Sequence, residues 1–254
     1  MKLVVLGSGT SVPHAARTAA GYWLETESGR ALLDISADAP HRMAREELDW
    51  VNLEAIWLSH FHLDHIGGLA PFLFGMRAAP QTQQRIQPLS IYGPPGFIKI
   101  LRSIDQSNDY RLLEQPFPVN LKEVEPGNEF ELLPGLKSAT LSTPHTRESL
   151  AIRLKDKSGS VLVYTSDTGY SDELIEFAKG AGLLLMECSF RKNKPVKTHL
   201  ELADAMQLAR KCEPQMLVLS HLYSEWDGID LAGEAKEHWP GITIAAFDGL
   251  RLEF

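Results

Sequence analysis

The sequence predicts an α+β fold in which two β-sheets pack face to face and helices cover their outer faces. Two observations predict this architecture. Strands and amphipathic helices alternate in the first part of the chain, and after a run of strands with two-residue periodicity the same alternation returns. A sheet that carries helices on one side must bury its other side, and a second sheet provides the cover. No low-complexity linker interrupts the sequence, so residues 1–254 are predicted to form a single domain.

The first part of the chain shows apolar runs bounded by Gly, Pro and Ser turns. Ser28-Gly29 marks a hairpin turn, and Pro94-Pro95-Gly96 marks the start of a helix. The elements predicted here are strand 3–6, strand 21–26, strand 31–34, helix 38–48, strand 55–58, helix 69–79, strand 88–92 and a helix that reaches about residue 104.

Between residues 117 and 165 the pattern changes to a period of two, which is typical of consecutive short strands. These strands are predicted at 117–119, 130–132, 136–142, 150–154 and 161–164. The alternation of helices and strands then returns with helix 172–179, strand 183–187, helix 199–212, strand 215–219, helix 230–238, strand 242–246 and a last strand at 250–254.

The charge balance argues against a protein that mainly binds nucleic acid. Lys and Arg number 25 against 33 Asp and Glu, a net charge of −8, and the basic residues cluster only at 191–194. Phosphate contacts require clustered cations, so no stable complex with nucleic acid is expected.

The two cysteines form no C-x-x-C pattern. Cys188 and Cys212 are therefore expected to be buried free thiols in a reducing cytoplasm. Residues 1–7 contain only four consecutive apolar residues, which is too short for a signal peptide or a membrane span. The chain is expected to enter the fold directly and to have no membrane partner.

A histidine-rich segment follows the strand predicted at 55–58. It contains four residues of ligand type, His60, His62, Asp64 and His65. If the backbone stays extended past Ser59, three of them project to one side and His65 to the other, so the segment can serve two neighbouring metal ions. Imidazoles and carboxylates suit zinc, manganese or iron. A solvated loop that is merely rich in histidine explains this grouping less well.

Three further ligand candidates each follow a predicted strand: His145, Asp167 and His221. Any one of them alone would be read as an ordinary loop residue. Because strand ends at one edge of a sheet converge, three repeats of this placement favour a common site. The other candidates, His14, His41 and His238, have no such companions and are expected to be surface or core histidines.

In order and spacing, these seven residues resemble the metal ligands of the metallo-β-lactamase superfamily over nearly the whole chain. The resemblance implies an αββα sandwich of two mixed sheets and a site for two divalent transition-metal ions, most readily zinc, with manganese or iron as alternatives. It also implies the ligand sets: His60, His62 and His145 for one ion, Asp64, His65 and His221 for the other, and Asp167 as the bridge.

Two further segments, residues 185–190 and 197–205, are similar to paired motifs of the ribonuclease Z and related phosphodiesterase branch, as is the opening Leu6-Gly-Ser-Gly-Thr10. In that branch a glutamate and a histidine, here Glu187 and His199, stand opposite the metals. Ribonuclease Z carries a long tRNA-gripping arm between the counterparts of His145 and Asp167. Here these two residues are only 22 apart, which leaves room for two strands and a turn.

The expected function is therefore that of a metal-dependent hydrolase that acts on small or cyclic phosphodiesters. Two metals can lower the pKa of a bridging water and stabilise the leaving oxygen, so the reaction needs no nucleophilic side chain. The alternatives are a lactonase or thioesterase on the same fold, and a metal-binding protein without turnover. Glu187 and His199 favour the phosphodiester reaction. A homodimer is compatible with the sequence.

The expected catalytic residues are Asp64, Glu187 and His199. His199 is expected to protonate the leaving oxygen. Thr198 and Glu201 match a capping box, which predicts His199 at the first position of a helix. There the helix end and two cations would lower the pKa of its imidazolium, and a hydrogen bond to Glu187 would raise it again. The alternative is that His199 only binds phosphate.

Asp34 ends the strand predicted at 31–34, close to where the metal ligands should gather. Metal-binding imidazoles need outer partners that fix their tautomers, and Asp34 is a candidate for this role. The alternative interpretation is an aspartate that caps a helix or a turn.

Overall fold

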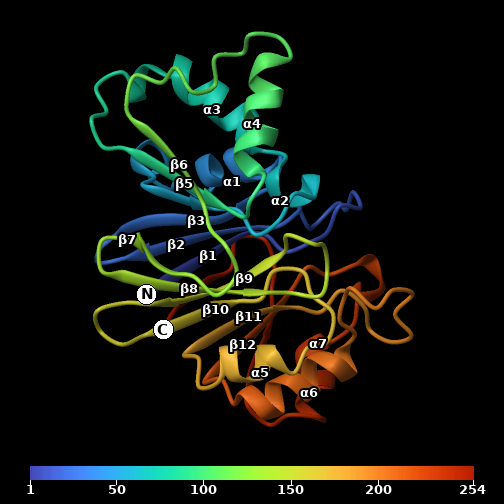
Figure 1. The fold of residues 1–254 in the computed structure, drawn as a ribbon. Helices are drawn as coiled ribbons and strands as arrows, with labels where there is room; N and C mark the ends of the chain where they lie inside the picture. Colours follow the sequence, from blue (N-terminus) through green and yellow to red (C-terminus); the bar gives the residue numbers. More distant parts are fainter.

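The computed structural model describes residues 1–254 and contains two seven-stranded sheets packed face to face, with helices on both outer faces (Figure 1). This confirms the predicted sandwich. Each sheet is mixed, and both are built by the same scheme, in which three antiparallel pairings are followed by three parallel ones.

The first sheet contains, in spatial order, β14 (Arg251–Glu253), β1 (Lys2–Gly7), β2 (Gly21–Thr26), β3 (Gly29–Ile35), β4 (Ala55–Trp57), β5 (Leu89–Gly93) and β6 (Val119–Glu123). Strands β14 to β3 pair antiparallel, and strands β3 to β6 pair parallel. The last strand of the chain thus lies beside the first, and the amino group of Met1 donates to the carbonyl of Phe254 at 2.7 Å (Figure 1).

The second sheet contains, in spatial order, β13 (Ile242–Ala245), β12 (Met216–Ser220), β11 (Leu183–Glu187), β10 (Val161–Tyr164), β9 (Leu150–Lys155), β8 (Leu136–Ser142) and β7 (Glu129–Leu133). Strands β7 to β10 pair antiparallel, and strands β10 to β13 pair parallel. Because β10, β11 and β12 run in one direction, the segments that follow them leave the sheet at one edge.

The helices fall into two groups along the chain. The first group is α1 (Ala39–Arg45), α2 (Leu63–Ile66), α3 (Leu69–Ala78) and α4 (Phe97–Gln106); the second is α5 (Glu173–Ala178), α6 (Leu202–Cys212) and α7 (Leu231–Lys236). Short 3-10 turns occur at Trp50–Asn52, Pro80–Thr82 and Ser224–Trp226. Helices α1, α3 and α4 cover the first sheet, and α5 to α7 cover the second (Figure 1). None of the helices combines the length and the apolar character needed to cross a membrane.

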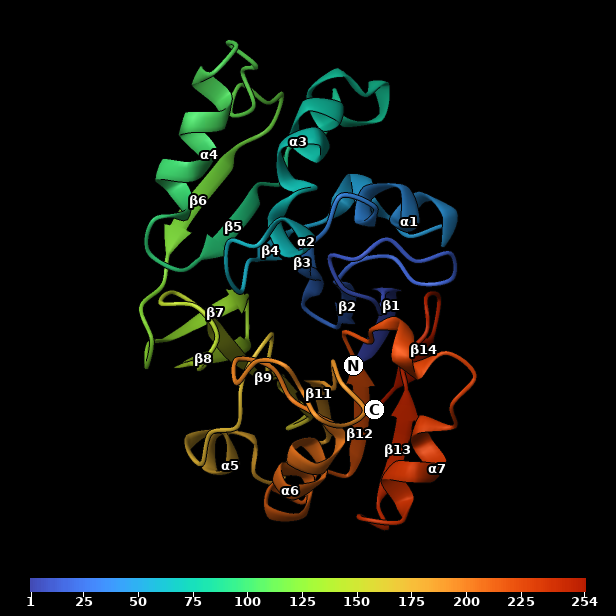
Figure 2. The same ribbon diagram turned by 90° about the vertical axis from the view of Figure 1, so that its right-hand side faces the viewer.

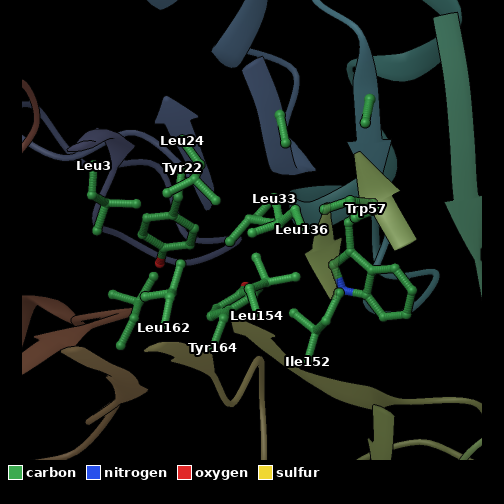
Figure 3. Close-up of a cluster of buried hydrophobic side chains, with 14 of the residues drawn as sticks. Leu3, Tyr22, Leu24, Leu33, Trp57, Leu136, Ile152, Leu154, Leu162 and Tyr164 are labelled. Carbon is green, nitrogen blue, oxygen red and sulfur yellow. The ribbon is translucent and has the colours of Figure 1, made fainter. Parts of the chain in front are cut away.

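The central core lies between the two sheets (Figure 3). Leu3, Tyr22 and Leu33 from the first sheet meet Ile152 and Leu162 from the second, and all five are buried. Burying one such side chain contributes roughly 1.5–3 kcal/mol, so this layer holds the sheets together. Two further apolar clusters lie under the two sets of helices.

Two predicted elements begin later than expected. The strand predicted at 117–119 runs from 119 to 123, and Phe117 is instead buried beneath the guanidinium of Arg85, 4.3 Å from its ring centre. The helix predicted from 199 begins at Leu202. Phe190 is the cause of the second difference, because its N–H donates to Leu200 and its carbonyl accepts from Leu202. This pairing keeps the preceding residues extended.

Candidate metal centre

All seven predicted ligands gather in one cluster. Helix α2, which contains Asp64 and His65, lies at the edge of the sandwich opposite the chain ends, the edge that Figure 2 turns toward the reader. They follow four strands, one in the first sheet and three in the second: His60, His62, Asp64 and His65 after β4, His145 after β8, Asp167 after β10 and His221 after β12. Three overlapping groups of ligand atoms occur, and the third combines Asp167 and His221 with His199. In the first group, His60, His62, His145 and Asp167 each offer one ligand atom, and these atoms lie within 4.8 Å of one another.

The second group consists of Asp64, His65 and His221 under the same distance limit. Nε2 of His221 lies 3.5 Å from Oδ2 of Asp64, and Nε2 of His65 lies 3.8 Å from the same oxygen. Asp167 lies between the groups, with Oδ1 3.4 Å from Nε2 of His65 and Oδ2 3.7 Å from Nε2 of His145. One carboxylate is therefore near ligand atoms of both groups.

The expectation that the segment after Ser59 stays extended is wrong beyond His62. His62 has φ −63° and ψ 144°, but the next four residues form the helical turn α2. Glycine is required directly after this turn, since a Cβ at Gly68 would lie 2.1 Å from the carbonyl oxygen of Ser36. The turn brings Asp64 and His65 into one group, whereas an extended chain would have directed them to opposite sides.

The donor set fits divalent cations. Nε2 of His60, His65 and His221 is buried and has no hydrogen-bond partner in each case. Buried polar atoms are almost always paired, so three unpaired nitrogens directed at one place indicate metal ligands. The other ring nitrogen of each is bonded, at 3.0 Å to Ser59 Oγ for His60, at 2.7 Å to Asp34 Oδ2 for His65 and at 3.0 Å to Ser189 Oγ for His221.

The charges of the centre are set by burial and by one another. Burial lowers the pKa of His60 well below its usual range, which favours the neutral, metal-binding imidazole. Burial alone would lower the pKa of His65, but Asp167 and Asp34 outweigh it and raise that pKa well above its usual value. Burial also opposes a charge on Asp167, yet His221 and His65 hold the pKa of this carboxyl well below its usual range.

Asp34 makes the contact expected of an outer partner. Besides Nδ1 of His65, its carboxylate accepts from the N–H and Oγ of Ser59 and from the hydroxyl of Tyr164, each at 2.7 Å. Burial and Asp34 raise the pKa of Tyr164 well above its usual value, so the hydroxyl keeps the proton that it donates. Asp34 has φ +57°, as does His221, and Ser166 has φ +56°.

The predicted pair of Glu187 and His199 is present. Nδ1 of His199 donates to Oε1 of Glu187 at 2.9 Å. His199 lies in the loop before α6 and not at its first position, so the expected influence of the helix end on this histidine is wrong. The N-cap is Glu201, whose N–H faces the carboxylate of Asp204 at 3.5 Å. Burial lowers the pKa of His199, but the bond and charge of Glu187 outweigh it and raise that pKa.

Sequence reasoning missed three residues of the site: Ser59, Tyr164 and Ser189. Ser59 directly precedes His60, and Ser189 follows Glu187 by two residues, but a single serine forms no recognisable sequence motif.

Outside the centre, His14 pairs with Asp227 at 2.8 Å. Both cysteines are free and buried, as predicted.

A sandwich of two mixed sheets with this cluster at one edge defines a metal-dependent hydrolase with the metallo-β-lactamase fold. Residues 1–236 match the family model described as Anti-Pycsar protein Apyc1, and the chain belongs to this family.

Known proteins agree with this class. The chain is 27% identical to the probable metallo-hydrolase YhfI of Bacillus subtilis over 260 residues, which is 100% of both chains. The crystal structure of YhfI has a TM-score of 0.83 and covers 100% of this chain and 99% of its own. The chain is 24% identical to ribonuclease Z of Anoxybacillus flavithermus over 301 residues, which is 97% of this chain and 95% of the relative. The short form of human tRNase Z has a TM-score of 0.80 at 20% identity, with 100% and 99% covered.

Proposed function

We propose that this hydrolase cleaves small or cyclic phosphodiesters at a centre that holds two divalent cations. The observation that carries the proposal is the position of one buried carboxylate, Asp167, between two groups of ligand atoms. We assign the ligands as follows: His60, His62 and His145 to one cation, Asp64, His65 and His221 to the other, and Asp167 to both.

The donor atoms are nitrogens and carboxylate oxygens, without a thiolate, which suits zinc and also manganese or iron. Two cations held by these residues would lower the pKa of a nearby water, so that it can act as the nucleophile, and would offset the charge of the phosphodiester. Elemental analysis after loading with zinc or manganese should give two ions per chain. Asp167→Ala should lose more metal than any other single substitution, and one ion or none in the unsubstituted protein would contradict the assignment.

His199 supports this chemistry as the proposed general acid. Glu187 holds its Nδ1, so Nε2 is the atom left to donate a proton. Its ring stacks on His221 with centres 5.4 Å apart and lies 4.7 Å from the ring of His145. The raised pKa of His199 favours the protonated form that an acid needs. Asp64, which is only partly buried, is the carboxylate that we propose accepts the proton of the attacking water.

The short connection between His145 and Asp167 favours small substrates. It consists of β9, β10 and their turns, without an inserted arm. The alignment with ribonuclease Z extends over 301 positions, more than the 254 residues of this chain, so that relative has residues with no counterpart here. With the net charge of −8, this supports weak binding of nucleic acid.

A substrate panel tests the proposed class. The zinc-loaded protein should hydrolyse bis-p-nitrophenyl phosphate and at least one cyclic nucleotide, and it should leave a tRNA precursor uncut. Efficient cleavage of the precursor would overturn the choice of small substrates. Faster turnover of a homoserine lactone than of every phosphodiester would assign the protein to the lactonases instead.

The acid role of His199 is tested by the leaving group. His199→Ala should keep its metal and lose on the order of 10²–10⁴-fold in kcat on an alkyl phosphodiester, because the alkoxide needs a proton to leave. The loss on a p-nitrophenyl ester should be much smaller, since p-nitrophenolate leaves without one. His238→Ala is the matched control, because His238 lies outside both ligand groups. Equal losses on both substrates would leave His199 as a binding residue only.

A further inference from the structure

Ser189 occupies the point where the metal ligands and the acid pair meet. It is fully buried, and its Oγ lies 2.6 Å from Oε2 of Glu187 and 3.0 Å from Nδ1 of His221. Nδ1 of His199 is more distant, at 3.3 Å, and already donates to Glu187. No other hydroxyl contacts both an expected metal ligand and the carboxylate of the acid pair.

The hydrogens of this contact can be assigned by elimination. A hydroxyl has one hydrogen to donate, and an ionised carboxylate can only accept. The hydrogen of Ser189 therefore goes to Glu187. Ser189 Oγ must then accept from His221, so Nδ1 of His221 carries the hydrogen and its Nε2 holds a free lone pair.

That lone pair points into the metal centre. Nε2 of His221 is buried without a hydrogen-bond partner and lies 3.3 Å from Oδ2 of Asp167 and 3.5 Å from Oδ2 of Asp64. In the other tautomer Nε2 would carry the hydrogen and could not bind a cation. The bond to Ser189 thus selects the tautomer in which His221 is a ligand.

His65 and His221 are held by different means. His65 donates directly to the carboxylate of Asp34 at 2.7 Å. No carboxylate contacts Nδ1 of His221, and the charge of Glu187 reaches it only through Ser189. Glu187 also accepts from the N–H of Thr168 at 2.7 Å and of Leu200 at 3.1 Å, so its position is fixed by the backbone on both sides.

We propose that Ser189 is a positioning residue that holds His221 in its metal-binding tautomer and connects this ligand to the pair of Glu187 and His199. The inference rests on the proposed function, because it takes His221 to be a ligand. Outer partners of metal ligands typically contribute 10–100-fold to metal affinity. A neutral hydroxyl should contribute at the lower end of this range. Its loss should therefore lower the affinity for one of the two cations about 10-fold.

The main test is Ser189→Ala, with zinc affinity measured by competition with a chelator. Affinity for one zinc ion should fall about 10-fold, and affinity for the other should stay unchanged. Ser149→Ala is the matched control, because Ser149 is also fully buried and bonds to Thr146 and not to a histidine. Nitrogen NMR of the metal-free protein gives a second measurement, in which His221 should change from a single Nδ1–H tautomer to a mixture.

Ser189→Thr keeps the hydroxyl and should restore the affinity. If Ser189→Ala does not fold, the threonine variant carries the test alone, and a 10-fold loss in it would overturn the inference. Glu187→Gln should lower the affinity for the same zinc ion. Combining it with Ser189→Ala should lower that affinity little further, since both substitutions break the same chain of hydrogen bonds. Fully additive losses would overturn the connection to Glu187.

His221→Ala separates this inference from the proposed function. If it leaves both zinc ions bound with unchanged affinity, His221 is not a ligand and the proposed metal assignment fails. If it removes one zinc ion while Ser189→Ala binds both normally and keeps the Nδ1–H tautomer, the assignment stands and the role of Ser189 is wrong.

Discussion

Replacing Asp34 by asparagine should lower the affinity for the cation that His65 is proposed to bind, and it should also lower the stability of the metal-free protein. The carboxylate of Asp34 is fully buried and accepts four hydrogen bonds, two from Ser59, one from Tyr164 and one from Nδ1 of His65. An amide offers one oxygen and one NH₂ group in the same volume. In either orientation the NH₂ group faces donors.

The size of the expected loss of affinity depends on which hydrogen-bond donors around residue 34 can reorient. With its oxygen toward the N–H of Ser59, the amide directs its NH₂ group at two hydroxyls, which can rotate, and at His65. His65 can accept there only by moving its hydrogen to Nε2, the atom proposed to bind the cation. The expected loss of affinity for that cation is 10–100-fold, which equals about 1.4–2.7 kcal/mol. The metal-free protein should lose about 2–4 kcal/mol, because charge-assisted hydrogen bonds to a buried carboxylate disappear.

Zinc affinity by chelator competition and stability by urea denaturation measure the two effects separately. Asp248→Asn is the matched control, since Asp248 also accepts four hydrogen bonds, from Ser8 and Thr18, but contacts no histidine. It should lower stability and leave zinc affinity unchanged. The reasoning is refuted if Asp34→Asn binds both zinc ions as tightly as the unsubstituted protein, or if the control loses zinc equally.

Three further predictions concern stability and reactivity. Removing metal with a chelator should lower the melting temperature, and zinc at 100 times its Kd should restore about 2.7 kcal/mol; an unchanged melting temperature would argue against a metal centre in the folded protein. Arg85→Met should cost about 2–4 kcal/mol in urea denaturation, because the buried guanidinium donates to four backbone carbonyls that would lose their partner, and a cost below about 0.5 kcal/mol would contradict this. Burial raises the pKa of Cys212 to about 11 and that of Cys188 well above its usual value, so at pH 8 neither thiol should react with a disulfide reagent until the protein unfolds. Rapid reaction of either thiol in the native protein would disprove that burial.

Strand ends were the part of the site that the sequence could predict. His145, Asp167 and His221 each follow a predicted strand, and the direction of parallel strands brings such positions together without any knowledge of side-chain geometry. The same argument placed Asp34 beside the ligands. Its partner Tyr164 could not be foreseen, because it approaches from the opposite sheet, 130 residues away along the chain.

The start of α6 could not be predicted because a tertiary contact decides it. Thr198 and Glu201 have the spacing of a capping box, but Phe190 pairs with the backbone of Leu200 and Leu202 and holds this segment extended. Local propensity is outweighed by this pairing. The consequence concerns function, since His199 is held by Glu187 and a loop and not by a helix end.

The division of ligands between the two halves of the fold gives the cations a mechanical role. In the proposed assignment, one cation joins His60 and His62 to His145, and the other joins Asp64 and His65 to His221. Each cation would therefore act as a removable cross-link between the two sheets, closing loops of the chain much as a disulfide does. Loss of metal should then let the sheets separate first at the edge where the ligands lie.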